Sequence, residues 1–163
     1  MQYLIRDKSS LRSREVTIED ARGQRVFRAH GPTLRIRDEL RLDDTWGNEQ
    51  IVIKEPVLSD RKTFELYRGG LRCGVVSMVS TGNLLEGFDV THTSAAPLHA
   101  RGDLLGREFT LVGAGGDLGH VHRHKGNAIE VETAGGQDDV LLLAGVLAMC
   151  AMTDAWARLH SHS

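Results

Sequence analysis

Apolar and polar residues alternate along short segments over most of this chain. In one segment the apolar side chains fall on one face and the charged side chains on the other: Leu34, Ile36, Leu40 and Leu42 against Arg35, Arg37, Glu39 and Arg41. A period of two residues is typical of a strand with one buried face. The pattern therefore predicts a protein built mainly from short antiparallel strands.

Strand–turn–strand units recur at a regular spacing. Four units cover residues 17–28, 40–53, 64–76 and 109–122. Their turn glycines, Gly23, Gly47, Gly70 and Gly116, are separated by 24, 23 and 46 residues. Because the last gap equals two periods, we expect a degenerate unit over residues 84–103. Short strands with evenly spaced turns predict a barrel or a sandwich.

The chain ends in a different pattern, a stretch over residues 138–159 that is apolar on nearly every face. A helix that is apolar all round must be buried on all sides. We therefore expect one helix over 138–157 whose Leu142, Val146, Met149 and Ala157 are covered by strands. Together the patterns predict a mainly β fold, a closed antiparallel barrel around a C-terminal apolar helix, as one domain over residues 1–163.

Four polar or small residues depart from the apolar pattern of this helix. Asp138 or Asp139 is suited to cap its N-terminus. Gly145 costs about 1 kcal/mol relative to alanine in mid-helix, which suggests close approach by a strand. Asp154 needs either an arginine partner at the barrel mouth or water, and its place just before Arg158 and the polar tail favours water.

A membrane span is not expected here. The uncharged run from Val140 to Met152 has thirteen residues, whereas a span needs about 20. The N-terminal residues contain no uninterrupted apolar run that would form a signal peptide. The sequence thus predicts no transmembrane segment and a cytoplasmic location.

Several motifs, taken in order, resemble a known family. They are a Tyr3-Leu-Ile-Arg-Asp-Lys opening, Asp-x-x-Gly turns at Asp20 and Asp44, Gly102-Asp103 before Arg107-Glu-Phe109, and the acidic-capped helix with its late Asp154. In this order they resemble the LURP-one-related family, whose members are similar to the tubby C-terminal domain and, more distantly, to phospholipid scramblases. The resemblance implies a closed twelve-stranded barrel threaded by a C-terminal helix, with no enzymatic activity.

Charge is unevenly distributed along the chain. The net charge of −2 predicts no general affinity for nucleic acid. Residues 1–41 nevertheless carry ten Lys or Arg against six Asp or Glu, and the remainder ten against sixteen. An exterior patch that includes Arg25, Arg35 and Arg37 would attract anionic lipid head groups. The alternative is an ordinary solvated strand face with interleaved carboxylates.

The histidines His120, His122 and His124 form the other candidate site. On a strand, side chains two residues apart point to one face, where imidazoles are able to share a zinc, iron or copper ion. Gly116, His122, His124 and Glu130 approach the first cupin motif, but the gap before Glu130 is longer and no second motif follows. The alternative to a metal site is a solvent-exposed polar strand face.

No nucleophile motif is present, and Cys73 and Cys150 cannot build a zinc knuckle. We therefore expect a non-catalytic barrel without cofactor or metal, which binds anionic phospholipid head groups at a membrane surface or serves as a protein-interaction scaffold. A metal-dependent, cupin-like enzyme that uses the His120/His122/His124 strand is the alternative.

Overall fold

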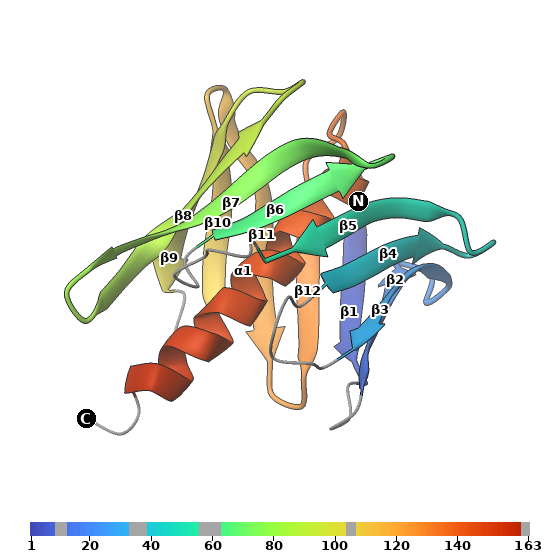
Figure 1. Cartoon of the computed structure of the whole chain (residues 1–163), viewed down its shortest axis with the longest axis horizontal. Coiled ribbons are helices and arrows are strands. Elements are labelled where there is room, and N and C mark those ends of the chain that lie inside the picture. Colours follow the sequence, from blue (N-terminus) through green and yellow to red (C-terminus); the bar gives the residue numbers. More distant parts are fainter. Residues whose placement is uncertain (9–12, 33–38, 56–62, 104–106, 161–163) are drawn as a thin grey trace.

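The computed structural model describes residues 1–8, 13–32, 39–55, 63–103 and 107–160. They form twelve strands and one helix (Figure 1). The strands are β1 (Gln2–Asp7), β2 (Ser13–Asp20), β3 (Arg25–Pro32), β4 (Glu39–Asp44), β5 (Glu49–Lys54), β6 (Thr63–Arg68), β7 (Leu71–Thr81), β8 (Leu84–His92), β9 (Leu98–Asp103), β10 (Glu108–Gly113), β11 (Gly116–His124) and β12 (Ala128–Thr133). The helix is α1 (Asp139–His160).

The strands form one closed barrel. Each strand pairs antiparallel with its neighbours in sequence, and β1 pairs with β12 to complete the ring. Closure leaves no unpaired strand edge. The predicted mainly β, twelve-stranded closed barrel is therefore confirmed.

The repeated strand–turn–strand units form hairpins, as predicted. The units at 17–28, 40–53, 64–76 and 109–122 are the hairpins β2–β3, β4–β5, β6–β7 and β10–β11, and the degenerate unit is β8–β9. Gly23 and Gly47 have φ angles of 78° and 82°, in the left-handed region that favours glycine. This conformation explains why the turn glycines recur at these positions.

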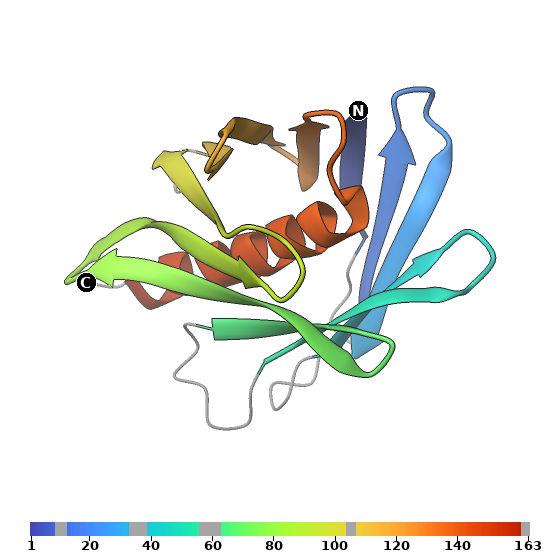
Figure 2. The ribbon, with the colours of Figure 1, turned by 90° about the horizontal axis from the view of Figure 1, so that it is seen from above.

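Helix α1 passes through the barrel, and Figure 2 shows it with strands on both sides. A barrel of about eight strands is filled by its own side chains, whereas a wider one leaves internal space. Here the helix fills that space, with Leu143, Val146 and Met149 almost fully buried against Ile5, Leu111 and other strand residues. Fully burying each such side chain is worth about 1.5–3 kcal/mol.

The two ends of the barrel differ. We call the end where α1 begins the proximal rim and the end where it leaves the distal rim. The turns at 21–24, 45–48 and 69–70 lie on the proximal rim, as does the start of β1. At this rim Asp138 caps the helix, because its Oδ1 accepts a hydrogen bond of 3.2 Å from the Leu141 backbone N–H.

Three details of the predicted helix were wrong. Ala157 is exposed, because the last turns of α1 extend past the distal rim. Asp154, for which we favoured water, forms an ion pair of 3.0 Å with Arg123 although it stays half-exposed. No strand approaches Gly145 closely: a Cβ built there would meet only Met149 Cε, at 3.9 Å.

Within the described residues, α1 is the helix long and apolar enough to cross a membrane, with a mean hydropathy of 1.9 in its best window. The apolar run is short, but the helix continues to His160, so its length does not exclude a span. However, 72% of that window is buried inside the barrel, and a core helix of this kind meets the same criteria. Burial, and not length, distinguishes this helix from a span.

Candidate functional site

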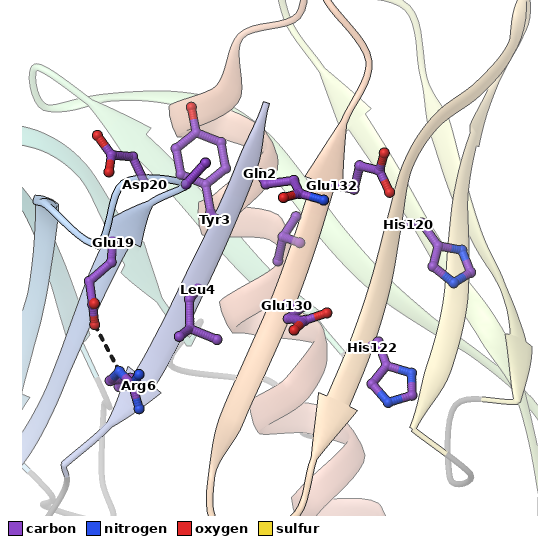
Figure 3. Close-up of a pocket in the computed structure, with 13 residues that line it drawn as sticks. Gln2, Tyr3, Leu4, Arg6, Glu19, Asp20, His120, His122, Glu130 and Glu132 are labelled. Carbon is purple, nitrogen blue, oxygen red and sulfur yellow. Dashed lines mark hydrogen bonds and ion pairs between the residues drawn. The ribbon is translucent and has the colours of Figure 1, made fainter.

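A groove of about 370 Å³ lies on the outside of the barrel, across β2, β1, β12 and β11 (Figure 3). The barrel interior is occupied by α1, so this groove offers space on the outer surface for a ligand. Its lining combines carboxylates, imidazoles, one guanidinium and a few apolar residues: Gln2, Tyr3, Leu4, Arg6, Glu19, Asp20, Ala21, Gly23, His120, His122, Glu130, Val131 and Glu132.

Carboxylates dominate the groove. Glu19 and Asp20 come from β2, and Glu130 and Glu132 come from β12, on the two sides of β1. The antiparallel register places Leu4 between Glu19 and Glu130, and Figure 3 shows this leucine between them. Such a concentration of one charge sign in a concave surface favours a cationic ligand.

Arg6 is the one arginine or lysine in this lining. Its Nε donates a hydrogen bond of 2.8 Å to Glu19 Oε2, drawn as a dashed line in Figure 3. This pair offsets the charge of Glu19, whereas Glu130 and Glu132, on the other side of β1, have no arginine or lysine partner in this lining. The β12 side of the groove is therefore the more electronegative side.

The three histidines of β11 lie on the outer face of the barrel, as their spacing predicted. Each has a carboxylate neighbour on an adjoining strand: Glu108 lies 3.0 Å from His120 and 4.0 Å from His122, and Glu130 lies 3.2 Å from His124. The rings of His122 and His124 are tilted, with centroids 4.4 Å apart. These histidine–carboxylate pairs form a polar ladder on the outer face of the barrel.

This ladder does not support the cupin-like alternative. In the part of the chain that the structure describes, no group of three His, Cys, Asp or Glu residues is arranged to hold a metal ion. The interval between His124 and Glu130 includes the β11–β12 turn, so the glutamate faces the histidine from the next strand. This is an ordinary cross-strand ion-pair geometry.

Of the three predicted lipid-binding arginines, one lies within the described residues. Arg25 begins β3 and is exposed. Arg35 and Arg37 lie outside the described residues, so their joint patch stays a prediction. Other basic residues of the first third have acidic neighbours: Arg28 is 3.2 Å from Glu15, and Arg41 is 2.7 Å from Asp43. Interleaved carboxylates thus neutralise much of the expected positive charge.

Neither cysteine is an activated nucleophile. Burial raises the pKa of the Cys150 thiol to about 12. Burial also raises the pKa of Cys73, although Arg68 opposes this shift. A reactive thiolate requires a lowered pKa and access to solvent. The surroundings of both cysteines therefore do not favour a reactive thiolate.

Sequence reasoning missed the acidic groove, since its residues are distant along the chain. Glu19 and Glu130 come from strands at opposite ends of the sequence, and only the closing pair β1–β12 brings them to one surface. The sequence offered one signal, the alternation of Glu130 and Glu132 with buried Ile129 and Val131. That pattern places both glutamates outside but not beside β2.

A closed twelve-stranded barrel around a C-terminal helix, with a large groove on its outer surface, defines a helix-threaded β-barrel protein. The family model for LURP-one-related proteins matches residues 1–150. The chain belongs to this family, as the order of its motifs indicated. No curated protein sequence matches the chain.

A solved structure supports the same architecture. An X-ray structure of a protein from Arabidopsis thaliana matches with a TM-score of 0.65 and covers 94% of this chain and 91% of that one. The two sequences are 16% identical. At this identity the likeness shows the fold, which agrees with the closed barrel described above.

Proposed function

We propose that this barrel is a non-catalytic protein-interaction scaffold, which binds a basic segment of a partner protein in its outer groove. The observation that carries the proposal is the convergence of Glu19, Asp20, Glu130 and Glu132 in one groove while α1 fills the interior. A ligand therefore has to be recognised from outside. We infer a cytoplasmic location for this role.

The groove's shape and chemistry suit an extended basic segment. It crosses four strands, and the half-buried, apolar Leu4 lies among the carboxylates. Lysine and arginine combine an apolar stem with a charged head, so their stems pack on such a residue while their heads reach the carboxylates. Charge complementarity of this kind increases the association rate and selects the partner.

Binding of a fluorescent oligolysine peptide, measured by anisotropy, tests the scaffold proposal. Glu130→Gln combined with Glu132→Gln should weaken binding by about three- to tenfold, since each exposed pair is worth about 0.2–1 kcal/mol. Glu39→Gln combined with Glu86→Gln makes the same charge change outside the groove and should not. If both double variants lost the same affinity for the peptide, net charge alone would explain binding, and the proposal would be contradicted.

Anionic phospholipid is the second candidate ligand, and the exposure of Arg25 favours it. Within the described residues Arg25 has no carboxylate partner, unlike Arg28 and Arg41. In this proposal Arg25, Arg35 and Arg37 attract lipid head groups and hold the protein at the membrane periphery.

Vesicle sedimentation tests the lipid candidate. Binding should favour phosphatidylserine-containing vesicles over pure phosphatidylcholine and weaken at high salt. Reversing Arg25, Arg35 and Arg37 to glutamate should abolish it without unfolding the barrel. Equal sedimentation with both vesicle types, or none at low salt, would contradict electrostatic lipid binding.

A further inference from the structure

Two neighbouring hairpins on the proximal rim carry matched turns. In the β2–β3 turn, Asp20 Oδ1 accepts hydrogen bonds of 2.9 and 3.0 Å from the backbone N–H groups of Arg22 and Gln24. In the β4–β5 turn, Asp44 Oδ1 accepts bonds of 2.9 Å from those of Trp46 and Asn48. Arg22 and Trp46 therefore occupy the same position in two turns that share the same pair of aspartate-to-backbone hydrogen bonds.

Trp46 is 85% exposed at its hairpin tip. Leu71, which follows the turn at 69–70 on the next hairpin, is 76% exposed. They are the most exposed large hydrophobic residues in the described part of the chain, and both lie on the proximal rim. Tryptophan combines an apolar ring with an N–H donor, which suits it to the boundary between water and lipid.

Positive charge accompanies these apolar tips. Arg22 and Arg25 are exposed, and neither has an ion-pair partner among the described residues. Asp20 and Asp44 accept backbone hydrogen bonds within their own turns, and Glu49 lies 3.6 Å from Arg41. Two arginines that have no ion-pair partner among the described residues thus lie on the same rim as the exposed tryptophan.

The three hairpin tips project separately from the barrel, on the right of both ribbon views (Figures 1 and 2). Trp46 and Leu71 do not line the groove described above. A fluid, anionic surface accommodates separate apolar tips flanked by arginines, because lipid molecules rearrange around each tip. A peptide segment would need a continuous apolar groove between them.

We propose that the proximal rim contacts an anionic bilayer, with Trp46 and Leu71 entering the interfacial region and Arg22 and Arg25 meeting lipid phosphates. This inference rests on the lipid candidate of the proposed function and replaces a general basic face with a defined membrane-contacting end. Apolar burial and phosphate contact then act together, as stable peripheral binding requires.

The two tryptophans make the contact directly measurable. Trp156 is only 7% exposed inside the barrel, so Trp46 is the one that lipid would quench. Phosphatidylserine–phosphatidylcholine vesicles with brominated acyl chains should quench the emission of the protein and shift its maximum to shorter wavelength. Trp46→Phe should remove the quenching and the shift, while the emission of Trp156 remains.

Vesicle affinity of matched variants completes the test. Trp46→Ser and Leu71→Ser should each weaken binding by about tenfold, because each forfeits most of one buried side chain. Leu84→Ser is the control: Leu84 is an exposed leucine of the distal rim, and its substitution should leave binding unchanged. Arg22→Glu should weaken binding, and Lys125→Glu, on the distal β11–β12 turn, should have less effect.

The outcomes separate this inference from the lipid proposal it rests on. Anionic vesicles that bind without quenching Trp46, and bind the serine variants equally well, would overturn the proximal-rim contact and leave the basic-face proposal standing. Absence of binding to anionic vesicles at low salt would overturn both. Quenching that is equal with neutral vesicles would contradict the role of Arg22 and Arg25.

Discussion

The hydroxyl of Tyr3 donates a hydrogen bond of 2.6 Å to Asp139 Oδ2, and so joins the first strand to the start of α1 across 136 positions. The same end of β1 is held by the N-terminal ammonium, which donates a bond of 3.0 Å to the carbonyl of Thr133. Burial raises the pKa of Tyr3, and the Asp139 carboxylate raises it further. Barrel closure and helix docking are therefore coupled at the proximal rim.

Tyr3→Phe should lower the free energy of unfolding by about 1–3 kcal/mol, because it leaves the Asp139 carboxylate without its buried hydroxyl donor. Tyr67→Phe is the matched control, since Tyr67 faces the outside of β6 and contacts Lys54. Urea denaturation of the two variants measures the difference. Equal losses would show that the hydrogen bond to Asp139 does not couple strand and helix.

Truncating the interior face of α1 should destabilise the barrel strongly. Leu143 is fully buried, and Leu143→Ala should cost about 2–5 kcal/mol through lost burial and the cavity left behind. Leu159→Ala removes the same atoms from a largely exposed position of the same helix and should cost less than about 0.5 kcal/mol. Similar thermal shifts for the two variants would contradict the threaded arrangement.

Much of the fold follows from local patterns. The alternation at Leu40 and Leu42, the left-handed glycines Gly23 and Gly47, and the apolar surface of α1 each reflect a local physical requirement. Such requirements are visible in a single sequence. The exposure of Ala157 was missed because it depends on where the barrel ends along α1, which no local pattern records.

The outer groove is less predictable for a related reason. His120, His122 and His124 could be placed on one face from their spacing, since strand geometry fixes it. The proximity of Glu19 to Glu130 depends instead on the closing pair of strands, whose register is set by long-range packing. The partner of Asp154 was missed in the same way, because Arg123 reaches it from another element.

Two glycines should respond oppositely to alanine. Gly145→Ala should raise the free energy of unfolding by up to about 1 kcal/mol, since an added Cβ meets only Met149 Cε at 3.9 Å. Gly87→Ala should lower it by about 1–3 kcal/mol, because an added Cβ would lie 2.3 Å from the Ala100 carbonyl oxygen. Chemical denaturation measures both changes. Destabilisation by Gly145→Ala would reveal tighter packing around the helix than the structure shows.

Asp43 should make stability depend on pH in the acid range. Its carboxylate lies 2.8 Å from His30 Nε2 and accepts a bond of 2.7 Å from Arg41 Nε. Burial alone would raise the pKa of Asp43, but the His30 and Arg41 bonds lower it on balance. A lowered pKa in the folded state means that the stabilisation is present above the unfolded value and is lost as pH falls through the folded one.

Asp43→Asn should therefore cost about 1–3 kcal/mol near pH 6, and the difference from wild type should shrink as the pH falls below about 4. Urea denaturation at a series of pH values measures this difference. Asp117→Asn, at the exposed start of β11, is the control and should change stability by less than about 0.5 kcal/mol at each pH. A cost of Asp43→Asn that stays constant down to about pH 2, below the range in which an ordinary aspartate is protonated, would show that the carboxylate charge does not stabilise this corner of the barrel.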